Sequence, residues 1–174
     1  MEQVATLFTL LSVYLTTRNN NLCWPIGIIG IFGFMNIFYQ NNDLANFGLQ
    51  FLFLFQSIRG WLNWNNKEIN IKNWSKNEKI TTFIVFSSIL ITLFLIFKYF
   101  FNDIKYLDIF TTSLSITALF LLTRKIIQTW YFWMIANVLY IIMFFEQQLY
   151  YSTILYFILL LLAFNGLLKW KKQL

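Results

Sequence analysis

The sequence contains no histidine, one cysteine and one proline among 174 residues. The absence of histidine removes the commonest general base and the commonest metal ligand. A single cysteine, Cys23, excludes an internal disulfide and a cysteine-based zinc site. The sequence also shows no nucleophile–base pair and no phosphate-cradling loop. We therefore expect neither an enzyme nor a protein that holds a metal or a cofactor.

Charged residues are scarce as well. Only 11% of the residues are charged, whereas 59% are hydrophobic and the mean hydropathy is +0.61. A soluble protein of this size would expose too much apolar surface, but lipid can cover such a surface directly. The net charge of +6 could indicate nucleic-acid binding. The basic residues lie at the ends of apolar segments, however, which favours membrane topology and no nucleic-acid partner.

Seven apolar segments follow one another along the chain and predict an all-α integral membrane bundle of seven transmembrane helices. Several are shorter than the ~20 residues of a straight span, so we expect interfacial aromatic and polar residues to complete them. Asn65–Glu78 is the one substantial polar loop. The segments are Val4–Thr17, Trp24–Tyr39, Leu44–Trp64, Ile80–Phe97, Ile109–Leu122, Trp130–Phe145 and Leu149–Leu168.

The lysines and arginines are distributed unequally between the two sides of this bundle. With seven spans, the loops after spans 1, 3 and 5 share a side with the C-terminus. Only Lys98 and Lys105 lie on the opposite side. Because basic loops stay in the cytoplasm, we expect the N-terminus outside and the C-terminus inside. The cytoplasmic side then holds Arg18, Lys67, Lys72, Lys76, Lys79, Arg124, Lys125, Lys169, Lys171 and Lys172.

The chain repeats itself at an offset of 106 residues, the separation of Trp24 from Trp130. The same offset relates Gly60 to Gly166, Trp64 to Trp170 and Thr17-Arg18 to Thr123-Arg124. It predicts a three-helix unit over residues 1–66, a loop and connector helix over 67–102, and a second three-helix unit over 103–174. An odd connector gives both units the same direction, a 3+1+3 parallel repeat of the SWEET type. Two similar units that rock against each other suit transport.

Five residues are candidates for a substrate site at the membrane midplane. Trp130, Trp133 and Asn137 share one face of the sixth segment, where they could stack a flat ring and bind its substituent. For the tryptophans the alternative is an interfacial aromatic belt, the role we also expect for Trp64. Gln50 and Tyr156 occupy equivalent positions in the two units, well below the outer surface. The alternative for Gln50 is a hydrogen bond between helices.

Two further patterns concern coupling and packing. All seven carboxylates fall in loops or at segment ends, whereas proton- and sodium-coupled carriers usually bury one mid-membrane. This placement predicts transport that is not coupled to an ion gradient. Gly27, Gly30 and Gly33 form a small-residue stripe that predicts close helix packing rather than a ligand site.

The motifs in both units resemble those of the PnuC family of vitamin-precursor transporters. The first unit carries Cys23-Trp24-Pro25-Ile26-Gly27, Gln50 and Gly60-Trp61-Leu62-Asn63-Trp64. The second unit carries Thr123-Arg124-Lys125, Trp130-x-x-Trp133-x-x-x-Asn137 and Asn165-Gly166.

This resemblance implies facilitated diffusion of nicotinamide riboside across a bacterial inner membrane. It implies a homotrimer and a cytoplasmic kinase that traps the product. It also implies substrate binding by Gln50, Trp130, Trp133 and Asn137, while Tyr156 is added from the repeat. Arg59 stands where the family often has an aromatic residue. Thiamin is an alternative substrate, and a membrane-embedded binding or assembly protein is the alternative function.

Overall fold

The structure is a computed structural model that describes residues 2–41, 44–65, 70–100 and 106–174. Seven helices account for most of these residues, and no strand occurs within the described ranges. Each predicted apolar segment coincides with one helix apart from its ends, so the seven predicted helices are confirmed. The helices are α1 (Glu2–Thr17), α2 (Cys23–Gln40), α3 (Leu44–Asn65), α4 (Lys76–Phe100), α5 (Tyr106–Thr123), α6 (Thr129–Glu146) and α7 (Tyr150–Lys171).

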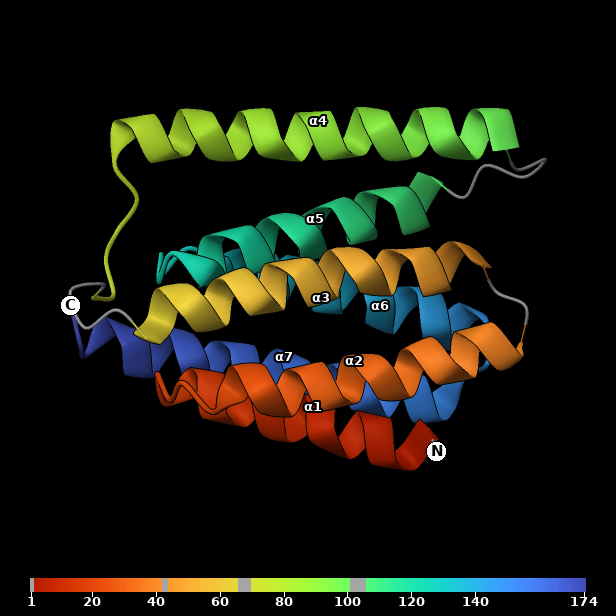
Figure 1. The fold of residues 1–174 in the computed structure, drawn as a ribbon, viewed down its shortest axis with the longest axis horizontal. Helices are drawn as coiled ribbons and strands as arrows, with labels where there is room; N and C mark the ends of the chain where they lie inside the picture. The colour runs from red at the N-terminus through yellow and green to blue at the C-terminus, as the bar shows by residue number, and fades with distance from the viewer. Residues whose placement is uncertain (1, 42–43, 66–69, 101–105) are drawn as a thin grey trace.

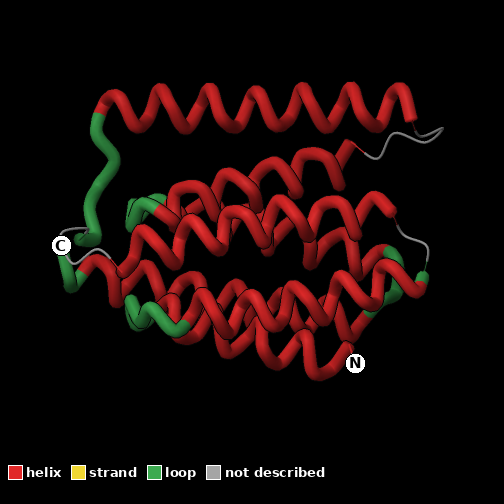
Figure 2. Tube along the Cα trace, viewed as in Figure 1, coloured by secondary structure: helices red, strands yellow, loops and turns green. Residues whose placement is uncertain are grey.

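Six of the helices form a closed ring by their contacts. The seventh, α4, lies outside it (Figures 1 and 2). Around the ring, α1 packs on α2, α2 on α3, α3 on α5, α5 on α6, α6 on α7, and α7 returns to α1. Helix α4 packs against α5 on the outside of the ring. The ring encloses a central axis, and α3 and α7 stand opposite each other across it.

Aromatic contacts join α4 to α5. Phe110 of α5 meets Phe86 of α4 edge to face, with ring centroids 5.8 Å apart. Ser113 and Thr117 follow Phe110 on the same helical face and are fully buried. Each hydroxyl donates to a carbonyl four residues earlier in its own helix, so neither leaves an unpaired polar group inside the protein.

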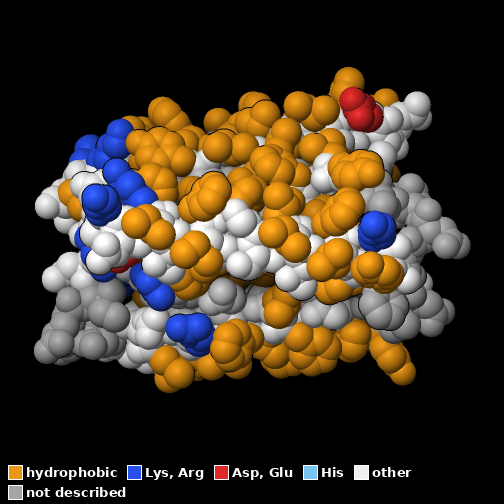
Figure 3. Space-filling view, turned by 90° about the horizontal axis from the view of Figure 1, so that it is seen from above, with side chains coloured by type: hydrophobic (Ala, Val, Ile, Leu, Met, Phe, Trp, Pro, Cys, Tyr) orange, Lys and Arg blue, Asp and Glu red, His pale blue; other side chains and the backbone are white. Residues whose placement is uncertain are grey.

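The outer surface of the bundle suits a membrane. Five helices, α2 and α4 to α7, are long and apolar enough to cross a bilayer, and α1 is a shorter apolar helix. Exposed aliphatic and aromatic side chains cover the outer surface (Figure 3). Lysine and arginine side chains gather at one end, which is the end where the C-terminus lies (Figures 1 and 3). We call it the basic end; the two predicted loop lysines at positions 67 and 105 lie outside the described residues.

The glycine stripe of α2 brings that helix close to α1, as predicted. A Cβ atom at Gly33 would stand 2.8 Å from the Cβ of Ala5, and one at Gly30 would stand 3.0 Å from the hydroxyl of Thr9. Both separations are too short for an ordinary side-chain contact, so only glycine permits this approach. The stripe therefore serves helix packing.

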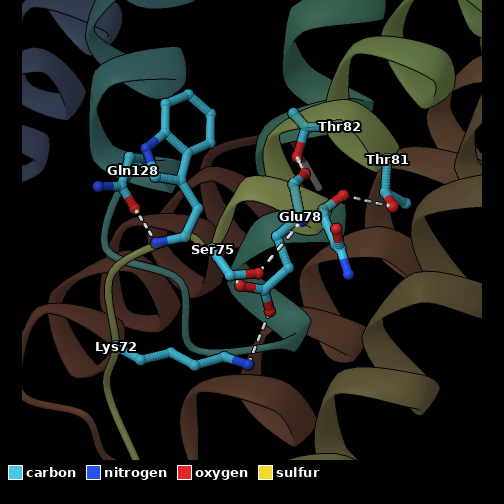
Figure 4. Close-up of polar contacts among 8 residues, drawn as sticks. Lys72, Ser75, Glu78, Thr81, Thr82 and Gln128 are labelled. Atoms are coloured by element: carbon cyan, nitrogen blue, oxygen red, sulfur yellow. Dashed lines mark hydrogen bonds and ion pairs between the residues drawn. The ribbon is translucent and has the colours of Figure 1, made fainter.

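The polar loop predicted over Asn65–Glu78 is shorter than expected, because α4 begins at Lys76. Ser75 and Glu78 form a reciprocal capping pair at this point (Figure 4). The backbone N–H of Ser75 donates to the Glu78 carboxylate at 2.8 Å, and the backbone N–H of Glu78 donates to the Ser75 hydroxyl at 3.3 Å. This pattern satisfies amides of the first turn, so a polar stretch starts the helix.

Candidate functional site

Asn137 is a buried amide in the middle of α6. Its side chain is 3% exposed and forms no hydrogen bond to any other residue that the structure describes. Asn137 follows the first residue of α6, Thr129, by eight residues, so it lies about 12 Å from the basic end of that helix. A buried amide without a partner is costly in a membrane. Its polar atoms are available to a ligand or to water.

Gln50 is a second such amide, contributed by α3. It is 8% exposed, and within the described ranges its side chain likewise makes no hydrogen bond. The interhelical hydrogen bond that was the alternative for Gln50 is therefore not formed among these residues. Gln50 lies six residues, or about 9 Å, from the first residue of α3, Leu44, which is at the end of the bundle opposite the basic end.

Tyr156 belongs to an aromatic stack between α6 and α7. Its ring centroid lies 4.5 Å from that of Tyr140 and 5.3 Å from that of Phe144. The interplanar angle is 32° for Tyr140, a tilted arrangement, and 25° for Phe144, a stacked one. Tyr140 follows Asn137 by three residues, so the stack continues the face of α6 that carries the amide.

Tyr140 and Phe144 were not among the residues predicted from the sequence. The sequence did contain a pattern that could have indicated them, because both residues continue the helical spacing of Trp133 and Asn137. The equivalent positions in α2, Phe34 and Phe38, also stack on each other, with centroids 6.1 Å apart. In a chain with 21 phenylalanines, this spacing alone could not distinguish a site from core packing.

Trp130 lies deeper in the protein than either sequence interpretation supposed. It is 1% exposed, and its six-membered ring covers Gly166 of α7 so closely that a Cβ there would overlap it. Its ring also meets Trp170 edge to face at 5.3 Å. A belt position facing lipid is therefore wrong for Trp130. Stacking of a substrate on this ring stays a prediction that requires the ring to leave Gly166.

The expectation that Trp64 is a belt residue is also wrong. Trp64 is 5% exposed, and its indole N–H donates to the carbonyl of Leu122 in α5 at 3.0 Å. Trp170 makes the matching bond, since its indole N–H donates to the carbonyl of Thr16 in α1 at 3.1 Å. The sequence could not predict the burial of Trp64. A tryptophan at the end of a helix is buried only if a neighbouring helix covers it, and the sequence does not show which helix is the neighbour.

Contacts recur at the offset of 106 residues that the sequence shows. Trp24 covers Gly60 as Trp130 covers Gly166, and the Trp24–Trp64 rings meet at 5.3 Å and 88°. The Trp130–Trp170 pair has the same distance and an angle of 86°. The turns after α1 and α5 also match, because Asn19 and Lys125 both adopt a φ of 53°.

The predicted residues of α6 and α7 lie at different levels along the bundle. The Trp130 ring covers Gly166, which follows Tyr156 by ten residues in α7, a rise of about 15 Å. Asn137 and Tyr156 are linked through Tyr140, with Trp133 one turn below Asn137.

Two surface hollows lie away from these residues. One is an open hollow on the outward face of α6, and another lies between α5 and α6 at the end opposite the basic end. Neither contains any of the five predicted residues. The first is lined by Met134, Ile135, Val138 and Leu139, and the second by Tyr106, Leu107, Asp108, Met143, Glu146 and Gln147.

Carboxylates within the described ranges stay near helix ends. Glu2 is the first residue of α1, Glu78 lies in the first turn of α4, Asp108 lies in the first turn of α5, and Glu146 is the last residue of α6. Three more, at positions 43, 68 and 103, lie outside the described residues. Within the described part of the chain, no three histidine, cysteine or acidic residues lie together in a way that could hold a metal ion.

Comparison with known proteins gives a consistent result. The sequence profile of the nicotinamide mononucleotide transporter family matches residues 1–172. The nicotinamide riboside transporter PnuC of Escherichia coli strain K12 is 27% identical over 202 aligned positions, which cover 98% of this chain and 84% of that protein. PnuC of Shigella flexneri gives the same values.

A solved structure shares the fold. The crystal structure of the vitamin B3 transporter PnuC matches with a TM-score of 0.83 and 16% identity, covering 99% of this chain and 80% of that one. The homologues are transporters and not enzymes, and the apolar helices fit a multi-pass protein of the bacterial inner membrane. The chain therefore belongs to the nicotinamide mononucleotide transporter family, whose PnuC members it resembles in sequence and fold.

Proposed function

We propose that the protein carries nicotinamide riboside, an NAD precursor, across the inner membrane by uncoupled facilitated diffusion. The observation that supports this most strongly is the burial of Gln50 and Asn137, two amides whose side chains make no hydrogen bond among the described residues. The Tyr140–Tyr156 ring contact continues the face of α6 that carries Asn137. Amides can pair with the carboxamide and ribose hydroxyls of this substrate. Aromatic faces attract its cationic pyridinium ring.

The substrate site in this proposal comprises Gln50, Asn137 and Tyr156, with Trp133 below them. Trp130 forms the floor in the conformation described and would meet the substrate only after moving. A nucleoside fits such a site better than a mononucleotide, because none of these residues is cationic and a phosphate would lack a counter-charge. Arg59 is the one basic residue of α3. It is exposed, and its guanidinium carbon lies 5.8 Å from the Phe55 ring centroid.

We also propose the 3+1+3 parallel repeat, with units over residues 1–66 and 103–174 and a connector over 67–102. The recurring tryptophan contacts and the matching φ angles of Asn19 and Lys125 support it. The gathering of lysine and arginine at one end supports an outside N-terminus and a cytoplasmic C-terminus. The pathway would follow the axis of the ring, between the two units.

The mechanism is a uniport because no carboxylate in the described ranges lies mid-membrane to bind a proton or a sodium ion. Accumulation of the vitamin would then depend on a cytoplasmic kinase that phosphorylates and traps it. A homotrimer, in which each protomer has its own pathway, is the assembly that the family resemblance favours.

A binding titration tests the substrate and the site together. We expect wild-type protein to bind nicotinamide riboside more tightly than thiamin or nicotinamide mononucleotide. Asn137→Leu should weaken nicotinamide riboside binding roughly 5- to 30-fold, since it leaves a substrate polar group unpaired. Asn165→Leu, the same change at an exposed position of α7, is the control and should leave affinity unchanged. Tighter binding of thiamin than of nicotinamide riboside would show that thiamin is the substrate. Equal effects of the two variants on affinity would show that the assigned site is wrong.

The alternative function is a membrane-embedded binding or assembly protein that uses the ring only as a scaffold. Liposomes that contain the purified protein distinguish the two, because only a transporter lets labelled nicotinamide riboside enter. Binding without entry would favour the alternative.

A further inference from the structure

Two tryptophans meet across the axis of the helix ring. Trp64 belongs to α3 and Trp170 to α7, the helices that stand opposite each other, yet their ring centroids lie only 5.9 Å apart. Each side chain is fixed by its indole N–H, which donates to a carbonyl of an adjacent helix of the ring. This pair therefore bridges the ring at its basic end.

The bridge is part of a larger apolar closure. Trp24 and Trp130 extend it on either side, which gives a continuous chain of four indole rings from α2 to α6. Lys125 caps it, with its ammonium 4.8 Å from the centroid of Trp64, and burial lowers the pKa of Lys125. The closure lies about 21 Å below Tyr156, on the side of the predicted exit to the cytoplasm.

A short segment, Asn70–Ser75, runs across this closure and is attached to the turn between α5 and α6. The backbone N–H of Lys72 donates to the carbonyl of Lys125 at 3.0 Å, and that of Ile127 donates to the carbonyl of Lys72 at 2.9 Å. Ile71 is 7% exposed and belongs to the same buried cluster as the four tryptophans. The segment thus places an apolar side chain under the bridge.

Gln128 strengthens this attachment from the α5–α6 turn (Figure 4). Its carbonyl oxygen accepts the backbone N–H of Trp74 at 3.0 Å, and its amide nitrogen donates to the side-chain oxygen of Asn73 at 3.0 Å. The segment is also joined to α4, because Lys72 forms an ion pair with Glu78 at 2.7 Å. This pair is partly exposed, so it contributes little to holding the segment in place. A few hydrogen bonds hold the segment, so it can detach without unfolding a helix.

We propose that the Trp64–Trp170 pair is the inner gate of the pathway and that Asn70–Ser75 is the latch that keeps it shut. The inference rests on the proposed transport function. In the latched state, a substrate at the site cannot leave to the cytoplasm. Release requires the segment to leave the α5–α6 turn, which removes Ile71 and frees the two tryptophans to separate.

A reversible cross-link tests the latch. In a Cys23→Ala background, Asn73→Cys and Gln128→Cys replace two side chains that already bond to each other. A short bis-methanethiosulfonate reagent would tether them, and a reductant would release them. In liposomes we expect cross-linking to reduce nicotinamide riboside uptake more than about tenfold and reduction to restore it, while affinity stays within about twofold.

A matched pair provides the control. Lys72→Cys with Glu78→Cys tethers the same segment to α4 instead, where an ion pair now joins them. Its uptake should be unaffected by the same reagent. Undiminished uptake by the tethered Asn73–Gln128 pair would overturn the latch and leave the transport proposal standing. Absence of uptake before cross-linking, in a folded protein, would instead overturn the transport proposal and the latch with it.

The native cysteine gives a second measurement that needs no cross-link. Cys23 is buried in the cluster that Ile71 closes. We expect Gln128→Leu, which removes both side-chain bonds to the latch, to speed the reaction of Cys23 with a thiol reagent several-fold from the cytoplasmic side. Gln147→Leu, at an exposed position at the opposite end, should not change that rate. Equal rates in both variants would contradict the latch.

Discussion

At the scale of single residues, two glycines set how closely the tryptophans can pack. A Cβ atom at Gly60 would overlap the ring of Trp24, and one at Gly166 would overlap the ring of Trp130. Since both rings are held by several neighbours, they cannot move aside cheaply. The Gly-Trp and Asn-Gly motifs of the two units therefore preserve space for an indole from another helix.

This packing predicts that Gly166→Ala destabilises the protein. Overlap with a fixed ring should cost about 1–3 kcal/mol of unfolding free energy, which thermal unfolding in detergent would measure. Gly48 is the matched control, because a Cβ there meets no atom within 4 Å. Gly48→Ala should be neutral or stabilising by up to about 1 kcal/mol, since alanine favours the helix. Equal melting temperatures for the two variants would show that the tryptophan contact is unimportant.

How far the sequence predicted burial depended on the residue type. Depth in an apolar segment sufficed to predict that Gln50 and Asn137 face the interior of the bundle, because an amide cannot face lipid without cost. It did not suffice for Trp64 and Trp130, since tryptophan suits both the interface and the core. Their burial depends on which helix lies next to them, and the sequence alone does not fix that neighbour.

At the scale of helices, hydropathy predicted all seven elements, and the main error was the start of α4. The residues from Lys76 to Lys79 are too polar to belong to an apolar segment, so they were assigned to a loop. The Ser75-x-x-Glu78 pattern was present and could have corrected this. The latch before it could not be predicted, because Asn70–Ser75 has no periodic pattern of its own.

Helix orientation yields a prediction at the same scale. A cysteine at Asn70, an exposed position at the basic end, should be shielded from impermeant thiol reagents in intact cells. A cysteine at Tyr151, which is exposed at the opposite end, should react readily. Both variants carry Cys23→Ala. The reverse labelling pattern would place the C-terminus outside and overturn the orientation.

At the scale of the whole molecule, the offset of 106 residues predicts a correspondence of α1–α3 with α5–α7, but it does not predict the order of the helices around the ring. That order depends on packing details such as the glycine face of α2 and the hydroxyl face of α5. Seven apolar helices are compatible with several arrangements. The ring and the tryptophan bridge across it could therefore not be predicted from the sequence.

The central claim is that this ring carries nicotinamide riboside without coupling to an ion gradient. Its most direct test is uptake of labelled nicotinamide riboside into liposomes that contain the purified protein, with and without an imposed proton or sodium gradient. Because no described carboxylate lies mid-membrane, we expect uptake to stop when the inside and outside concentrations are equal, whatever the gradient. Accumulation above the outside concentration when either gradient is imposed would contradict the account.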